Sequence, residues 1–147
     1  MATQSCSEMI RMDEIASKVF LLEQVGLLRQ YTVYLSIEDL RIDGWDVFVT
    51  LTGKKDGKKY TIRLRCDGGY PLNPPSVVFV NPNNNGMEGN EFWPNDGERA
   101  FKKSQNPPFI CVPGIREYHS RHQGTNFTTR DASLPKIVTE LVTMMNK

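Results

Sequence analysis

The sequence predicts one α+β domain over residues 1–147, and three observations support this fold class. Apolar residues near the start recur at helical spacing, two alternating segments flank an Asp-Gly pair, and an apolar helix behind a capping serine closes the sequence. A helix, a run of strands and a second helix form the order expected when helices cover one face of an antiparallel sheet.

The composition excludes several classes of protein. Of the 147 residues, 39% are hydrophobic and 24% charged, as in ordinary soluble domains, and the formal net charge is +1. We therefore expect no nucleic-acid partner and no membrane surface as a partner. No apolar run is long enough to span a membrane, and no basic segment precedes one, so no secretion signal is expected. Three unpatterned cysteines indicate a cytoplasmic protein: Cys6, Cys66 and Cys111.

The first element is predicted to be a helix over about residues 7–28. Ser5 and Glu8 form a capping box, in which each side chain accepts a hydrogen bond from a free backbone N–H group. Apolar residues then follow helical spacing and are expected to form the buried stripe: Met9, Met12, Ala16, Val19, Phe20 and Leu27. The charged residues of this segment are expected to face solvent.

A strand, a polar corner and a hairpin follow in the prediction. Residues 31–37 alternate and are rich in Tyr, Val and Thr, which favours a strand, and residues 39–44 form a polar corner. The pair Asp56-Gly57 suits a two-residue type I′ turn. That turn places three apolar pairs on one face: Leu51 with Ile62, Val49 with Leu64, and Val47 with Cys66. Cys66 is then a core residue, and the neighbouring lysines form a solvated tip.

A proline-rich segment comes next, with the sequence Tyr70-Pro71-Leu72-Asn73-Pro74-Pro75. Three prolines without N–H donors exclude a helix interior or a central strand, so a stiff, extended bridge is expected, in which a cis peptide bond can occur. Residues 76–80 then form a strand. The following loop over residues 81–108 is too long for an incidental connection and is predicted to be functional, with aromatic anchors at Phe92, Trp93 and Phe101.

The last part of the chain holds a short apolar stretch and a helix. The stretch is Phe109-Ile110-Cys111-Val112, and Pro113-Gly114 breaks it. Ser133 is the expected N-cap, and Pro135 is tolerated in the first helical turn. The buried stripe of this helix is predicted to include Leu134, Ile137 or Val138, Leu141 and Met145.

The order of these elements resembles the ubiquitin-conjugating enzyme fold, over about residues 7 to 146. The proline segment looks like the Tyr-Pro-x-x-Pro-Pro bridge of that family, and Ile110-Cys111-Val112 is similar to its Ile-Cys-Leu active-site signature. The resemblance implies an N-terminal helix, an antiparallel β-meander, a long active-site loop and a C-terminal helix.

The resemblance also implies a reaction. Cys111 would accept the C-terminus of a ubiquitin-like protein from an activating enzyme as a thioester, and would pass it to an amine of a protein substrate. A thiolate suits this role, because it is a strong nucleophile and its thioester stays reactive toward amines. No organic cofactor is implied, since ATP would be used by the activating enzyme.

Two features depart from the family pattern. A His-Pro-Asn tripeptide usually precedes the cysteine, but none occurs here, and Asn106 is near in sequence without standing at the matching place. Only one long helix follows the cysteine, where eukaryotic members continue through more. Both features resemble compact bacterial relatives from antiphage defence operons, as does the run Arg116-Glu117-Tyr118-His119.

Further residues are candidates for supporting roles at the site. His119 is the first, since a neutral imidazole can orient the thiol or take a proton; a structural histidine is the alternative. His122 is a second candidate of the same kind. Arg116 would bind a carboxylate or carbonyl of the thioester-linked tail, or would pair near Glu117.

Three other interpretations remain open from the sequence. Cys111 can be a buried apolar filler, as most free cysteines are. Cys111, His119 and His122 are compatible with a zinc site, hydrolytic or structural, because all three are zinc-ligating residue types. The chain can also be a binding module that keeps the fold without catalysis, since fold alone does not determine function.

Overall fold

The structure, a computed structural model, describes the backbone of residues 6–83, 89–122, 124 and 126–147, and side chains from residue 13 onward. It confirms an α+β fold. A long helix precedes the sheet and a shorter one follows it: α1 (Cys6–Gln30) and α3 (Leu134–Met145). Between them lie four strands of one sheet: β1 (Ile37–Asp43), β2 (Asp46–Thr52), β3 (Lys59–Arg65) and β4 (Ser76–Val80). Shorter elements complete the order: η1 (Asn90–Phe92), β5 (Phe101–Lys102), β6 (Phe109–Ile110), α2 (Arg116–Arg121) and η2 (Thr129–Ala132).

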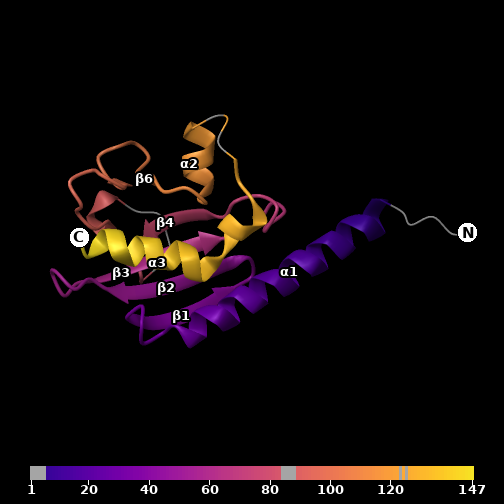
Figure 1. Ribbon diagram of the computed structural model, residues 1–147, viewed down its shortest axis with the longest axis horizontal. Coiled ribbons are helices and arrows are strands. Elements are labelled where there is room, and N and C mark those ends of the chain that lie inside the picture. The colour runs from indigo at the N-terminus through magenta and orange to yellow at the C-terminus, as the bar shows by residue number, and fades with distance from the viewer. Residues whose placement is uncertain (1–5, 84–88, 123, 125) are drawn as a thin grey trace, which may run out of the picture.

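The four strands form an antiparallel meander in the order β1-β2-β3-β4. Val49 pairs with Ile62, which pairs with Phe79, and these three fully buried side chains lie on one face. Helix α3 lies across the sheet, and α1 runs beside α3 and extends past the body at its N-terminal end (Figure 1). The side chains of this face and the two helices therefore share one hydrophobic core.

The buried side of α1 differs from the predicted stripe. Among the side chains of α1 from residue 13 onward, five are buried against the body: Ser17, Leu21, Gln24, Val25 and Leu28. The Gln24 side-chain oxygen accepts a hydrogen bond of 3.0 Å from the Leu134 N–H, which joins α1 to the start of α3. The prediction is wrong for Ala16, Val19 and Leu27, which are exposed, whereas Phe20 is half-buried. The side chains of Met9 and Met12, and the Ser5 cap, lie outside the described residues.

The predicted strand over residues 31–37 and the predicted corner over residues 39–44 are also wrong. Helix α1 continues to Gln30, and residues 31–36 form turns in which the Ile37 N–H donates to the Thr32 carbonyl. The strand is β1, whose residues are mostly exposed or half-buried because it is the edge strand of the sheet. Its polar sequence therefore resembles a loop, although its backbone pairs with β2 along its length.

The β2–β3 hairpin has a longer loop than the predicted two-residue turn. Thr52 pairs with Lys59, so residues 53–58 form the loop, and the Gly53 N–H donates to the Lys58 carbonyl. The Asp56 carboxylate accepts hydrogen bonds from the Lys58 N–H and from the Tyr60 hydroxyl, which stabilise this loop. The predicted register is wrong by two residues. An even shift keeps every side chain on its predicted face, so Cys66 is fully buried as expected.

The later elements follow the prediction more closely. Strand β4 has the predicted bounds, and Trp93 and Phe101 are buried against Phe79, as expected for anchors of the long loop. The Ser133 hydroxyl caps α3 by accepting a hydrogen bond from the Lys136 N–H. All the residues predicted for the α3 stripe are buried: Leu134, Ile137, Val138, Leu141 and Met145.

The proline segment is a turn rather than an extended bridge. The N–H groups of Leu72 and Asn73 both donate to the Gly69 carbonyl, and the Tyr70–Pro71 peptide bond is cis. Tyr70 is fully buried, and its hydroxyl donates to the Ala132 carbonyl. The turn is thereby fixed to the segment that leads into α3.

Candidate functional site

Cys111 lies at the end of a two-stranded ladder that the long loop forms. Strands β5 and β6 pair Phe101 with Ile110, and the Cys111 N–H continues this pairing by donating to the Ala100 carbonyl at 2.7 Å. Ile110 and Val112 on either side are buried, whereas Cys111 itself is partly exposed. Because alternate residues of a strand face opposite sides, the ladder directs the thiol outward. Cys111 is therefore not the buried filler that its apolar neighbours allowed.

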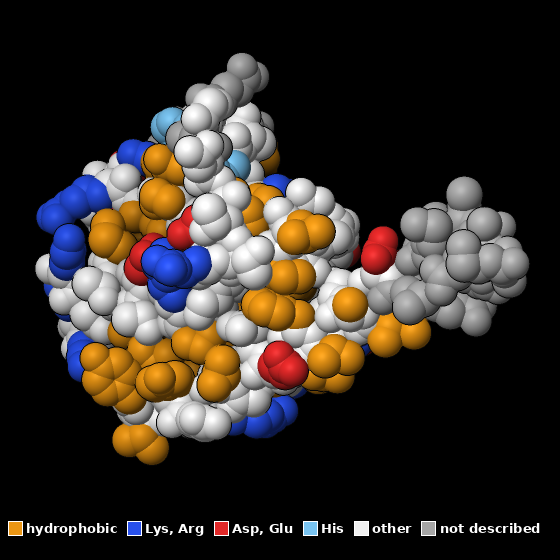
Figure 2. Space-filling model, turned by 45° about the vertical axis from the view of Figure 1, so that its right-hand side comes forward, with side chains coloured by type: hydrophobic (Ala, Val, Ile, Leu, Met, Phe, Trp, Pro, Cys, Tyr) orange, Lys and Arg blue, Asp and Glu red, His pale blue; other side chains and the backbone are white. Residues whose placement is uncertain are grey.

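The His122 side chain contacts the Cys111 thiol. The Nε2 atom of His122 lies 3.6 Å from the Cys111 Sγ atom, within reach of a weak hydrogen bond to sulfur. His122 follows α2, and its N–H donates to the Tyr118 carbonyl at 3.0 Å. Its ring also lies 4.4 Å from the Tyr118 ring, centroid to centroid. Both histidine side chains of the chain reach the surface at the end of the molecule where α2 lies (Figure 2).

His119 has a different contact. Its Nε2 atom accepts a hydrogen bond of 3.0 Å from the Gly114 N–H, so this nitrogen carries no proton in that arrangement. Gly114 has a φ of 95° and a Cβ atom there would lie 3.0 Å from the Asp131 carbonyl oxygen, which favours glycine. His119 therefore holds the turn that follows Cys111, between the thiol and η2.

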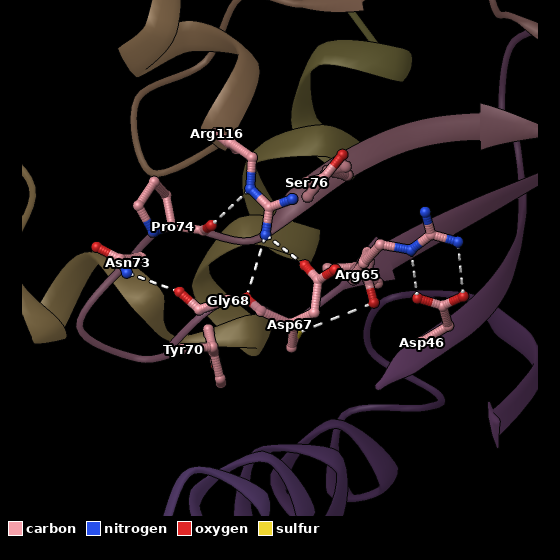
Figure 3. Close-up of polar contacts among 12 residues, drawn as sticks. Asp46, Arg65, Asp67, Gly68, Tyr70, Asn73, Pro74, Ser76 and Arg116 are labelled. Atoms are coloured by element: carbon pink, nitrogen blue, oxygen red, sulfur yellow. Dashed lines mark hydrogen bonds and ion pairs between the residues drawn. The ribbon is translucent and has the colours of Figure 1, made fainter. Parts of the chain in front are cut away.

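Arg116 forms hydrogen bonds with Pro74 in the proline segment and with Asp67 shortly before it (Figure 3). Its guanidinium donates to the Asp67 carboxylate at 2.6 Å, to the Asp67 carbonyl at 3.2 Å and to the Pro74 carbonyl at 3.3 Å. The Arg116 charge and hydrogen bond hold the pKa of Asp67 below its usual value. The partners of Arg116 are thus Asp67 and Pro74 rather than the predicted surroundings of Glu117. Binding of a carboxylate or carbonyl of the thioester-linked tail by Arg116 stays a prediction.

Glu117 was missed as a structural residue by the sequence interpretation. Its carboxylate accepts hydrogen bonds from the Ser76 hydroxyl, at 3.0 and 3.1 Å, and from the Val77 N–H at 2.9 Å. Burial raises the pKa of Glu117 above its usual value, against the opposing effect of these hydrogen bonds. Arg116 and Glu117 thus attach the first turn of α2 to both sides of the point where β4 begins.

Asn106 is exposed and lines a shallow pocket of about 350 Å³ in the long loop. The other walls include Phe79, Trp93, Pro107 and Pro108, and the Asn106–Pro107 peptide bond is cis. The lining does not include Cys111. A supporting role of Asn106 toward the thiol stays a prediction.

The described residues contain no group of three His, Cys, Asp or Glu side chains that could hold a metal ion. The zinc alternative required Cys111, His119 and His122 as joint ligands. In the structure the His119 Nε2 atom is instead bonded to the Gly114 N–H, which leaves this nitrogen no free lone pair for a metal. The ligand set that the alternative needs is therefore not assembled.

A cation–π contact between the end of α2 and strand β6 was also missed. Arg121, the last residue of α2, places its guanidinium carbon 3.9 Å from the centroid of the Phe109 ring. The sequence spacing of Phe109 and Arg121 does not predict this contact. The two residues meet only because the chain turns at Pro113-Gly114 between them. Phe109 is two residues before Cys111, a position that faces the same side of a strand.

Comparison with known proteins assigns no family: no protein-family model matches the chain, and no curated protein matches it. None of the helices in the described part of the chain is both long enough and apolar enough to cross a membrane.

Proposed function

We propose that this protein is a conjugating enzyme for a ubiquitin-like protein. It takes the C-terminus of that protein from an activating enzyme as a thioester on Cys111 and transfers it to an amine of a protein substrate. The observation that carries the proposal is a partly exposed thiol, directed outward by the β5–β6 ladder, with an imidazole nitrogen 3.6 Å from the sulfur. The proline segment and the residues around Cys111 add the family resemblance.

The first step is a transthiolation. His122 takes the Cys111 proton, and the sulfur attacks the thioester carbonyl of the activating enzyme's adduct. A new S–C bond forms at Cys111, the S–C bond to the activating enzyme breaks, and the leaving thiolate takes up a proton. The number of thioesters is unchanged, so no oxidant, reductant or metal is required.

The second step is aminolysis. The substrate amine attacks the thioester carbonyl, a C–N bond forms, and the Cys111 thiolate leaves. The imidazole of His122 can accept the proton that the amine loses. His119 acts on the turn at Gly114 rather than on the reacting atoms, so its place in the proposal is that of a positioning residue.

Two surfaces are assigned to partners. The activating enzyme docks on the outer side of α1, where Ile15, Val19 and Leu22 are 57%, 49% and 50% exposed. The tail of the ubiquitin-like protein lies along the long loop, the segment after Cys111 and α3. ATP is consumed by the activating enzyme, and a place among compact bacterial conjugation systems, as in antiphage defence, follows from the same resemblance.

A thioester assay tests the proposal. The chain, its cognate activating enzyme, ATP and the ubiquitin-like protein should give an adduct on a non-reducing gel that disappears on treatment with a thiol. Cys111→Ser should give no adduct or one that resists thiols, because an oxygen ester is less reactive. Absence of an adduct in the native chain, together with retained binding of the ubiquitin-like protein, would identify a binding module instead.

A further inference from the structure

The guanidinium of Arg121 packs on the ring of Phe109, two residues before the proposed thioester site. It lies 3.9 Å above the Phe109 ring, while Arg121 is otherwise exposed. Stacking on an aromatic ring uses one face of the planar guanidinium and leaves its N–H edges able to donate to a carboxylate in pairs. A fixed, edge-exposed arginine of this kind suits recognition of an acidic group.

The ladder places this cation on the same side as the thiol. Phe109 pairs with Lys102, and Cys111 continues the same register opposite Ala100, so Phe109 and Cys111 face the same direction. Two residues along a strand span about 7 Å. His122 at the sulfur and Arg121 at the Phe109 ring are consecutive residues at the end of α2, which brings both side chains to one surface.

The charge of this surface is not balanced by carboxylates in the described part of the chain. No ion pair joins Arg121 to a described Asp or Glu, and Lys102, opposite Phe109, donates to the uncharged carbonyl of Glu98. Asp131, which lies next to Gly114, pairs with Lys136 instead. An acidic ligand arriving here therefore meets cationic groups that are not already neutralised.

We propose that Arg121 selects acyl donors that carry an acidic side chain close to their C-terminus. This inference rests on the proposed function and names the substrate class of the same site. An extended peptide advances about 3.3 Å per residue, so the acidic side chain belongs about two residues before the residue that is linked to Cys111. A basic tail is disfavoured by the same cation.

Synthetic peptide thioesters test this without an activating enzyme. Three five-residue peptides end in Ala-Gly, carry Asp, Asn or Lys as the third residue from the end, and are esterified to a small thiol. Transfer forms the bond between Cys111 Sγ and the acyl carbon, breaks the bond to the small thiol, and releases that thiol with the proton from Cys111. Mass spectrometry of the intact protein follows the adduct, with Cys111→Ser as the blank.

The expected result is transfer about threefold faster from the Asp peptide than from the Asn peptide, and about tenfold faster than from the Lys peptide, at low salt. The preference should shrink toward equality at about 0.5 M salt, because exposed charges are screened. Arg121→Gln should remove the preference, and Arg121→Glu should reverse it. Arg29→Gln removes one exposed arginine from the end of α1 and should leave the preference unchanged.

The outcomes separate the two proposals. No adduct at Cys111 with any of the three peptides would overturn the proposed function together with this inference. Adducts at equal rates from the Asp and Lys peptides would leave the conjugating function standing and overturn the role of Arg121. A preference that survives both Arg121→Gln and Arg121→Glu would likewise overturn it.

Discussion

Two histidines three residues apart make unlike contacts. His119 accepts a hydrogen bond from the Gly114 backbone, whereas His122 presents a nitrogen to the Cys111 sulfur. The difference arises because α2 ends at Arg121, so His122 leaves the helical path and turns toward the end of β6. The sequence identified both as candidates and placed His119 first. The end of a six-residue helix decides which ring reaches the thiol, and spacing alone does not fix it.

Replacing His122 is expected to slow the chemistry of the thiol. In His122→Asn the sulfur loses its neighbouring base, so alkylation of Cys111 by iodoacetamide at pH 7 should fall about tenfold. The rate is measured by mass spectrometry of the intact protein, in a Cys6→Ser background. Burial raises the pKa of Cys66 to about 12, so this thiol does not compete for the reagent.

Cys111→Ser provides the blank for that measurement, and His119→Asn provides the comparison. The latter removes an acceptor for the Gly114 N–H and is expected to lower thermal stability more than His122→Asn does. An alkylation rate unchanged in His122→Asn would contradict the assignment of His122 as the base.

The other site residues show what a sequence can and cannot indicate. Cys111 could be proposed as a candidate from local sequence, because a short apolar strand precedes it and a Pro-Gly turn follows it. The structural role of Arg116 depends on Asp67 and Pro74, which are more than 40 positions away in the chain. Arg121 was missed because its contact with Phe109 crosses the turn after Cys111. Contacts between segments that are far apart in the chain leave no local sequence pattern from which they could be predicted.

At the scale of elements, the errors have a common physical origin. Helix α1 carries apolar residues on two sides, one against the core and one exposed, and helical spacing does not tell which side is buried. Strand β1 is polar because it is an edge strand with few buried positions. The strands β2, β3 and β4 and helix α3 were located correctly, apart from the β2–β3 register, because their many buried apolar positions leave a strong pattern.

Glu117 links α2 to the start of β4, and its contribution to the free energy of unfolding should depend on pH. The folded-state pKa is raised by burial, so protonation favours the folded chain. The contribution of Glu117 is greatest below its unfolded pKa, about 4.5, and is lost as pH rises through the higher folded-state pKa. In Glu117→Gln the amide still accepts from the Val77 N–H without a charge. This variant should gain free energy of unfolding relative to the native chain as pH rises from about 4 to 7.

Urea denaturation at several pH values measures this difference. Glu117→Ala is the matched comparison, because it leaves the Val77 N–H and the Ser76 hydroxyl without their acceptor. That variant should lose about 1–3 kcal/mol of stability. A difference between Glu117→Gln and the native chain that stays constant with pH would show that Glu117 keeps its ordinary pKa.

For the molecule as a whole, the two proposed working surfaces lie on different elements. The thiol sits on the β5–β6 ladder, and the exposed apolar residues belong to α1, which lies away from α2 (Figure 1). Figure 2 shows hydrophobic side chains along α1 toward its N-terminal end. Surface apolar residues cost solubility, and a row of them on one helix is typical of an interaction surface.

This separation allows docking and chemistry to be altered independently. Val19 and Leu22 are about half exposed, so Val19→Glu with Leu22→Glu should leave folding intact, since both side chains already face water. Because a charge in an apolar interface is left unpaired, loading from the activating enzyme should fall by more than about tenfold. Loading from a peptide thioester, which needs no docking, should be unchanged. Leu72→Glu, at the more exposed position Leu72 (78%) on the proline turn, is the control for added surface charge. Equal loss in both loading assays would mean that the α1 variant damages the thiol site or the fold, and normal loading in both would place the docking surface elsewhere.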